Sequence, residues 1–245
     1  MDLRYNYWYF KSALTFKECK HIIDVGEKRI KEFHAHKYST IGTTAGNQSK
    51  QEIQSTNKDA KPLADLTKQE VLKEETYIRD SEVCFFNYDW CYDLVMPYVH
   101  KANKEAGWNF DIEFAEDFQF TKYHPDGFYG WHVDGGGDMY SSYLPLDENT
   151  KKEKGRLYSP FSNWQGKCRK LSVTINLNSP DEYEGGKLKF DYGPHTNDER
   201  YHECDEIKPQ GSIIVFPSFM YHQVTPVTRG TRYSLVLWAL GNPFR

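Results

Sequence analysis

The change of hydrophobic pattern near residue 110 constrains the fold of this 245-residue chain more than any other feature. Before that point, apolar residues recur with helical spacing. After it, short runs rich in β-branched and aromatic residues are separated by Gly, Pro, Asn and Asp. Helices followed by many strands predict helices packed on an all-β barrel or sandwich. We therefore expect a mainly β protein with supporting N-terminal helices.

Two helices are expected in the first half of the chain. The first begins at Thr15, where Thr-Phe-Lys-Glu forms a capping box, and continues to Phe33. The second covers residues 88–106 around Pro97 and stops at Gly107. Between them, residues 38–61 show no strong period, which predicts a long surface loop.

The second half of the chain contains the expected strands. They cover residues 114–123, 129–133, 171–177, 187–191, 211–216 and 231–240. Residues 138–170 form the one long interruption of this series. A segment of that length in a compact domain is either a functional lid or a surface insertion, and the pattern does not distinguish the two.

Composition excludes several classes of protein. The net charge of -4 and the pI near 6.1 provide no overall cationic field for nucleic acid or an anionic membrane surface. No apolar run approaches the roughly 20 residues of a membrane-spanning helix, and the first residues lack the apolar core of a signal peptide. The five cysteines are odd in number and scattered, so we expect reduced thiols in a soluble, cytoplasmic protein. The oligomeric state stays open.

A His-x-Asp triplet stands in one of the expected strands. Residues two apart on a strand project from the same face with about 6.5 to 7 Å between their Cα atoms, so His132 and Asp134 can converge on one ion. The triplet alone is common by chance. His222 strengthens it, because it lies at the start of a strand that follows the buried run 211–216. Two histidines and one carboxylate form a three-ligand face for a divalent transition metal.

Arg232 opens an apolar strand, where a buried cation is costly unless it is paired. A bidentate carboxylate from a ligand would satisfy it, and Ser234 could donate to the same carboxylate. Pairing with a local Asp or Glu, or exposure at the strand end, is the alternative. If residues 228–230 form a three-residue hairpin loop, His222 pairs with Val236 and shares a face with Arg232. A two-residue turn would put the two on opposite faces.

Four segments of the chain carry a resemblance to a known family. Residues 120–134, which contain Gly-Trp-His-Val-Asp, are followed by residues 171–188, 211–218 and 222–232. Their order, spacing and flanks resemble the Fe(II)- and 2-oxoglutarate-dependent dioxygenases, and among them the prolyl 4-hydroxylase-like branch with its bacterial PKHD-type members. Residues 78–83 also resemble the strand that precedes the core in bacterial members. The resemblance is strong over the C-terminal half of the chain and loose over the N-terminal half.

The resemblance implies a fold and a site. The fold is a double-stranded β-helix, or jelly roll, over residues 110–245, supported by a helical and mixed region over residues 1–109 in one integrated domain. His132, Asp134 and His222 would hold Fe(II). Arg232 would bind the distal carboxylate of 2-oxoglutarate, to which Tyr123 would contribute a hydroxyl group. The number of coordination positions agrees, since three protein ligands on an octahedral metal leave two positions for 2-oxoglutarate and one for dioxygen.

The resemblance also implies hydroxylation of an unactivated C–H bond, best matched by a prolyl residue of a peptide or protein partner. Succinate and CO2 would be the co-products, and ascorbate would be an additional reductant. No catalytic residue is expected beyond the metal centre. Aromatic residues of the 138–170 segment are the candidate substrate contacts: Tyr140, Tyr143 and Trp164.

Three alternatives stay open at the level of sequence. The chain could hydroxylate a free amino acid or another small molecule. It could be a zinc-type hydrolase in which the same ligands activate water. It could also be a non-catalytic jelly-roll binding module. Arg232, together with Ser234 and Tyr123, favours the dioxygenase over the zinc-type hydrolase, and a binding module would not need the complete set of metal ligands.

Overall fold

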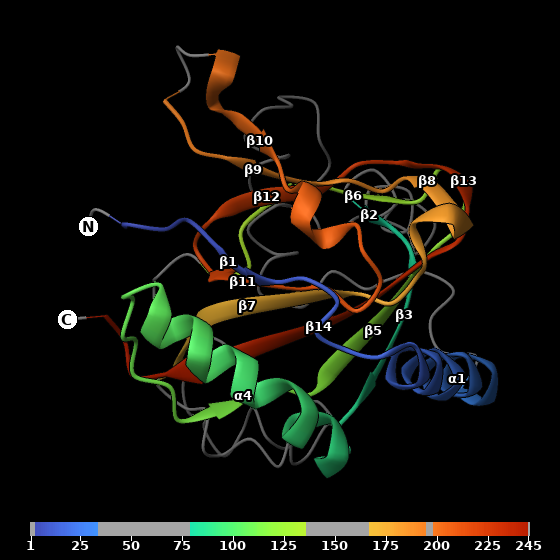
Figure 1. The fold of residues 1–245 in the computed structure, drawn as a ribbon, viewed down its shortest axis with the longest axis horizontal. Coiled ribbons are helices and arrows are strands. Elements are labelled where there is room, and N and C mark those ends of the chain that lie inside the picture. Colours follow the sequence, from blue (N-terminus) through green and yellow to red (C-terminus); the bar gives the residue numbers. More distant parts are fainter. Residues whose placement is uncertain (1–2, 34–78, 136–166, 195–197, 245) are drawn as a thin grey trace, which may run out of the picture.

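Two facing antiparallel sheets with two helices on one side form the body of the computed structural model (Figure 1). The structure describes residues 3–33, 79–135, 167–194 and 198–244. The expected loop at 38–61 and the candidate substrate contacts Tyr140, Tyr143 and Trp164 lie outside these described residues. The expectation of a mainly β jelly roll with supporting helices is confirmed.

The major sheet has seven strands in the order β1-β11-β7-β14-β5-β3, with β4 beside β14. Their bounds are Trp8–Phe10 (β1), Glu82–Phe86 (β3), Phe114–Ala115 (β4), Phe118–Tyr123 (β5), Cys168–Asn176 (β7), Ile213–Pro217 (β11) and Arg232–Gly241 (β14). Strands from both ends of the chain therefore meet in this sheet.

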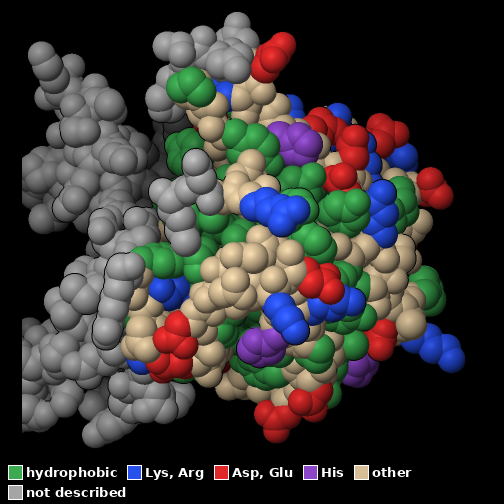
Figure 2. Space-filling view, turned by 60° about the vertical axis from the view of Figure 1, so that its left-hand side comes forward, with side chains coloured by type: hydrophobic (Ala, Val, Ile, Leu, Met, Phe, Trp, Pro, Cys, Tyr) green, Lys and Arg blue, Asp and Glu red, His purple; other side chains and the backbone are tan. Residues whose placement is uncertain are grey.

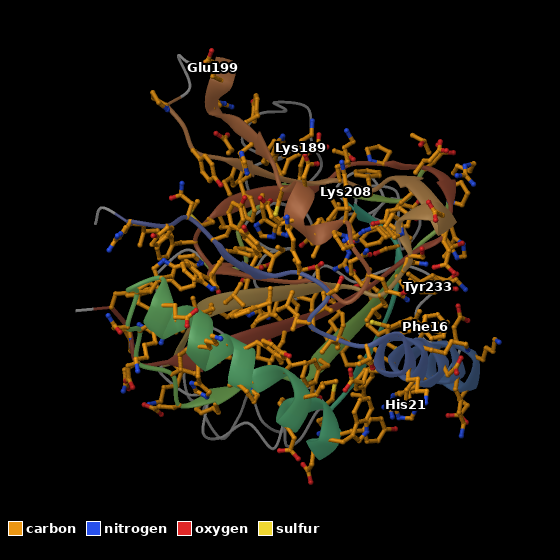
Figure 3. The ribbon with its side chains drawn as sticks, viewed as in Figure 1. Phe16, His21, Lys189, Glu199, Lys208 and Tyr233 are labelled. Carbon is orange, nitrogen blue, oxygen red and sulfur yellow. The ribbon has the colours of Figure 1, made fainter. Side chains whose placement is uncertain are left out.

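The minor sheet has five strands in the order β10-β9-β12-β6-β2. They span Arg79–Asp80 (β2), Phe128–His132 (β6), Leu188–Asp191 (β9), Tyr201–Glu203 (β10) and Tyr221–Val224 (β12). A third sheet of two strands pairs β8 (Tyr183–Gly185) with β13 (Val227–Gly230). The β9–β10 arm projects from the body, with Glu199 near its tip (Figure 3).

The two expected helices are present. α1 (Phe16–Phe33) begins after Thr15, whose side chain accepts from the Glu18 backbone while Glu18 accepts from the Thr15 backbone at 2.6 Å. This is the predicted capping box. α4 (Asp89–Glu105) contains Pro97 and buries Cys91, Val95, Val99 and Ala102, which recur at helical spacing.

Both helices pack on one face of the major sheet (Figure 1) and form the larger hydrophobic core with it. α1 is also tied to the sheet by charge and hydrogen bonding. Glu27 accepts from the Tyr233 hydroxyl at 2.7 Å and pairs with Lys122 at 2.7 Å, and Tyr233 lies beside α1 in Figure 3. A smaller hydrophobic cluster includes Phe190, Ile214 and Phe216, which come from strands of both sheets.

Two strand predictions differ from the structure. The expected strand 114–123 is two strands, β4 and β5, with a break at residues 116–117. β7 begins at Cys168, so Arg169 and Lys170 belong to a strand and not to the long interruption. β7 starts this early because its first residues pair with the last residues of β14, where Arg169 lies opposite Leu240 across a register shift. Sequence periodicity does not show such a bulge.

The hairpin register expected for His222 is wrong. β12 pairs with β9 and β6 in the minor sheet, whereas β14 pairs with β4, β5 and β7 in the major sheet. His222 therefore lies opposite His132 and Phe190, not opposite Val236. The connecting residues cross from one sheet to the other, and β13 pairs with β8 on the way.

The cysteines lie inside the fold, and charged side chains lie on its surface. All five cysteines are buried and form no disulfide. Within the described ranges, no helix has the length and apolar character to cross a membrane. Acidic and basic side chains are interspersed over the face shown in Figure 2.

Two neighbouring residues of β3 provide a matched test of the core. Phe86 is 2% exposed and its ring lies 6.1 Å from that of Phe118, whereas Phe85 points away and is 46% exposed. We expect Phe86→Ala to lower the free energy of unfolding by about 3 to 5 kcal/mol. Phe85→Ala should lower it by less than about 1 kcal/mol. Equal losses in urea unfolding would contradict the packing described here.

Candidate metal centre

Three potential metal ligands converge at the ends of two neighbouring interior strands of the minor sheet. His132 ends β6 and lies directly opposite His222 on the neighbouring strand β12. Asp134 follows β6, and its carboxylate oxygens lie 3.6 Å from Nε2 of each histidine. One ligand atom from each residue lies within 4.8 Å of the others. The expected His-Asp-His grouping is therefore present as a compact cluster.

Backbone carbonyls orient both imidazoles. Nδ1 of His132 lies 2.7 Å from the Gly130 oxygen, and Nδ1 of His222 lies 2.9 Å from the Met220 oxygen. A carbonyl oxygen can only accept, so each Nδ1 carries the proton. In the neutral ring this leaves the Nε2 lone pair free, and both Nε2 atoms face Asp134. Such an outer hydrogen bond fixes the tautomer that a metal ligand needs.

The protonation states suit metal binding. Burial lowers the pKa of His222 to about 4, with a further decrease from His132, so its imidazole is neutral at pH 7. Burial alone would raise the pKa of Asp134, but interactions with the two histidines and Arg169 bring it below its usual range. At neutral pH the cluster is thus a carboxylate with a neutral imidazole beside it. This is the donor chemistry that Fe(II) and Zn²⁺ accept.

Backbone bonds hold Asp134 in place. Its N–H donates to the Ser218 oxygen at 3.0 Å, and Arg169 donates to its carbonyl oxygen at 3.2 Å. Ser218 is fully buried in the turn before β12, the strand that carries His222. The carboxylate is therefore anchored to the same turn that leads into the second histidine strand.

Arg232 enters the same cavity from the opposite sheet. It begins β14, pairs with Tyr123 on β5, and is 1% exposed. In the part of the chain that the structure describes, its Nε and Nη1 have no hydrogen-bond partner and it forms no ion pair. The alternatives of a local acidic partner or simple exposure therefore find no support among these residues. A buried guanidinium without an acceptor fits a carboxylate ligand.

The cavity between the sheets brings the predicted residues together. It contains ≈ 450 Å³ of space not filled by atoms, part of which is open to solvent. Its lining includes His132, Asp134, His222, Arg232, Tyr123 and Ser234. Ser234 is 2% exposed, and the Arg232 Cζ lies 5.4 Å from the centre of the Tyr123 ring. Three metal ligands and an unpartnered cation in one buried space fit a divalent metal together with a carboxylate-bearing co-substrate.

Sequence reasoning missed other residues that line the cavity, among them Arg79, Tyr129 and Trp238. The Tyr129 ring stacks 3.5 Å from the His132 ring, and the Arg79 Cζ lies 4.5 Å from the centre of the Tyr129 ring. Trp238 has a buried Nε1 without a partner among the described residues.

A sequence signal existed for Trp238. Trp238 follows Ser234 by four residues on β14, so the alternation of a strand would have placed it on the cavity face. Tyr129 shows no such signal, because a register shift in the β6–β12 pairing brings it to the same side as His132.

An ion pair lies against Trp238, one of the residues that line the cavity. The Arg169 guanidinium donates to both carboxylate oxygens of Glu116, at 2.5 and 2.6 Å, and its Cζ lies 3.9 Å from the centre of the Trp238 ring. Glu116 is 7% exposed. A bidentate pair of this kind is fixed in geometry, which holds the Trp238 ring in place.

Comparison with known proteins agrees with this geometry. A family model described as the 2OG-Fe(II) oxygenase superfamily matches residues 118–240. A PKHD-type hydroxylase of Xylella fastidiosa is 36% identical over 123 residues, which cover 49% of this chain and 42% of that protein. A PKHD-type hydroxylase of Stenotrophomonas maltophilia is 33% identical over the same length, covering 49% and 41%. The matched part thus spans less than half of these relatives.

Solved structures share the fold. A viral collagen prolyl hydroxylase from Paramecium bursaria Chlorella virus-1, solved as a 2-oxoglutarate complex, superposes with a TM-score of 0.56 at 17% identity over 97% of both chains. A Pseudomonas putida prolyl-4-hydroxylase superposes with a TM-score of 0.50 at 15% identity over 96% of this chain and 92% of that one.

Arg232→Met tests whether the buried guanidinium destabilises the protein when no ligand is bound. Removing a buried charge that has no partner should raise the free energy of unfolding by roughly 1 to 3 kcal/mol, measured with urea in the presence of a chelator. Arg229→Met is the control, because that side chain is 59% exposed and pairs with Glu184 at the surface. Its effect should stay below about 1 kcal/mol. A clear loss of stability in Arg232→Met would mean that the guanidinium already has partners.

Proposed function

The chain belongs to the 2OG-Fe(II) oxygenase superfamily, and we propose that it uses Fe(II), 2-oxoglutarate and dioxygen to hydroxylate an unactivated C–H bond. One observation carries the proposal: the unpartnered guanidinium of Arg232 lies in the same buried cavity as the His-Asp-His cluster. A zinc-type hydrolase needs a metal-bound water but no such cation for a carboxylate co-substrate. A binding module needs neither.

His132, Asp134 and His222 would hold the metal. Bound Fe(II), together with 2-oxoglutarate and dioxygen, supplies the oxidation of the C–H bond, with succinate and CO2 as co-products. The carbonyls of Gly130 and Met220 keep the two imidazoles aimed at Asp134 before any metal arrives. The two imidazoles therefore need little rearrangement to bind the ion, which favours tight and selective binding.

Arg232 would bind the distal carboxylate of 2-oxoglutarate. Charge-assisted hydrogen bonds to a carboxylate contribute roughly 1.5 to 3 kcal/mol each, and burial keeps water from competing for them. Ser234 lies two residues along the same strand, and Tyr123 lies opposite Arg232 on β5. Both hydroxyls would donate to the same co-substrate. This assignment gives Arg232, Ser234 and Tyr123 a common partner.

The substrate would be a prolyl residue in a peptide or protein. PKHD-type hydroxylases are among the relatives, and prolyl hydroxylases share the fold, which supports this class. Tyr129 and Trp238 give the cavity flat aromatic walls that suit a pyrrolidine ring, and the unpartnered Trp238 Nε1 offers a hydrogen bond to a peptide carbonyl.

Several earlier expectations stay predictions. Tyr140, Tyr143 and Trp164 remain candidate contacts to the peptide. Ascorbate remains the expected auxiliary reductant. The division into a supporting region, 1–109, and a core, 110–245, within one integrated domain also remains an expectation.

Succinate release tests the reaction class directly. The purified protein is loaded with Fe(II) without oxygen and then exposed to air with 2-oxoglutarate and a panel of prolyl peptides. We expect succinate in amounts that rise with the correct peptide, and peptide mass increased by one oxygen atom. The same panel includes free proline and other amino acids, so stimulation by these alone would assign a small-molecule substrate. No succinate under any condition would refute the proposed reaction.

Two histidine variants serve as matched controls for that assay. His132→Ala should abolish succinate formation and metal binding by isothermal titration. His124→Ala should leave both unchanged, because the His124 side chain is 47% exposed and pairs with Glu82 outside the cavity. Turnover retained in His132→Ala would contradict the ligand assignment without affecting the family assignment.

Gly186 tests the placement of Arg232. Its φ is +56°, and a Cβ there would lie 2.7 Å from the Arg232 Cδ. Gly186→Ala should therefore displace the guanidinium and raise the KM for 2-oxoglutarate by about tenfold, or ~1.4 kcal/mol, with metal affinity unchanged. Gly107→Ala is the control, because its φ of +72° carries a similar backbone penalty and a Cβ would meet nothing within 4 Å. An equal change in both variants would assign the effect to backbone strain.

A further inference from the structure

A second hollow lies apart from the metal cavity, at the end of the chain. It has ≈ 880 Å³ of open space, and we call it the Lys170 hollow. Its lining residues are Trp108, Asn109, Phe110, Asp111, Lys170, Asn242, Pro243 and Phe244. None of these lines the metal cavity, so the two spaces are distinct.

Lys170 is a buried cation that the proposed reaction does not use. It is 3% exposed, and its Nζ lies 3.5 Å from the centre of the Phe244 ring. Its near neighbours are the Phe244 ring and the Cys168 side chain, which forms a hydrogen bond with it, and among the described residues it forms no ion pair with a carboxylate. Burial lowers the pKa of Lys170, and its interactions with Cys168 and Asp111 only partly compensate. A buried ammonium in this state gains from an anion.

The walls of the Lys170 hollow are aromatic. Trp108 and Phe110 are 6% and 8% exposed, and their rings stack with centroids 6.4 Å apart. The Phe110 and Phe244 rings meet edge to face at 5.1 Å. These contacts fix the rings in place, so the hollow offers preformed flat apolar surfaces beside the ammonium.

The one acidic residue of the lining is already engaged. Asp111 is exposed and accepts from the Asn242 side-chain amide at 2.8 Å. Because it makes no ion pair with Lys170, it does not fill the place beside the ammonium. It does disfavour a second negative charge near the opening, which limits the ligand to one anionic group at the lysine end.

We propose that the Lys170 hollow binds a small carboxylate with a flat apolar body, such as an arylcarboxylate. The carboxylate pairs with the Lys170 ammonium, and the apolar body packs on Trp108, Phe110 and Phe244. A bare inorganic anion would leave the aromatic walls unused. A cation would be repelled by Lys170. A neutral aromatic would leave the buried ammonium without its partner.

Calorimetric titration with three probes tests the proposal. The full chain is first saturated with 2-oxoglutarate and Mn(II) without oxygen, so that Arg232 is engaged. Benzoate is then compared with benzamide, which lacks the charge, and with acetate, which lacks the aromatic body. We expect benzoate to bind at least about tenfold more tightly than either, a difference of ~1.4 kcal/mol. Equal affinity for the three probes would overturn the proposal without reference to any variant.

Three variants locate the site. Lys170→Met should lose benzoate binding at least about tenfold while remaining folded, because methionine matches the side-chain volume and removes only the buried charge. Lys187→Met is the matched control, since that side chain is 44% exposed and pairs with Glu203 at the surface. Arg232→Met should bind benzoate as the wild type does, which separates this site from the proposed co-substrate site. Benzoate binding retained in Lys170→Met, or lost in Arg232→Met, would overturn the assignment.

Discussion

The direct pairing of β6 with β12 is the constraint on which the candidate site depends. It places His132 opposite His222, so two histidines separated by ninety positions of sequence meet at one point of the minor sheet. Ser218 completes the arrangement. Its carbonyl accepts the N–H groups of Asp134 and Gly135, its N–H donates to the Lys170 carbonyl, and its hydroxyl lies 3.0 Å from that of Ser172. One buried serine thus joins the carboxylate to both the major sheet and the second histidine strand.

The cavity lies between two sheets, and this arrangement allows it to contain charges that a packed core would reject. Asp134 is ionised beside the two histidines, and Arg232 is buried without a partner in the described residues. Unpaired buried charge destabilises a fold by several kcal/mol unless a ligand compensates it. The stability needed to tolerate this comes from elsewhere, from the apolar layer between the major sheet and its two helices. Separation of the two layers lets one be optimised for packing and the other for binding.

Much of this could be predicted from the sequence, because local chemistry determines it. The Thr15 capping box fixed the start of α1, and the strand alternation placed Arg232 and Ser234 on one face of β14. The pairing of strands was less accessible. His222 was expected opposite Val236, yet its partners are His132 and Phe190, because the chain crosses between sheets after β12. No local pattern encodes such a crossing. The convergence of His222 and Arg232 was right, although the hairpin argument for it was wrong.

Arg169, Arg232 and Lys170 show how the neighbours of a cation separate a structural charge from one that is directed at a ligand. Arg169 is satisfied, since Glu116 accepts from it twice and the Trp238 ring lies beneath it. Arg232 and Lys170 are more deeply buried, at 1% and 3% exposed, and neither forms an ion pair with an acidic residue among the described residues. All three carry a positive charge, so charge alone does not predict the difference. What distinguishes them is the neighbouring carboxylate, and its absence in two separate hollows is most simply explained if each cation is completed by a carboxylate that the chain itself does not carry.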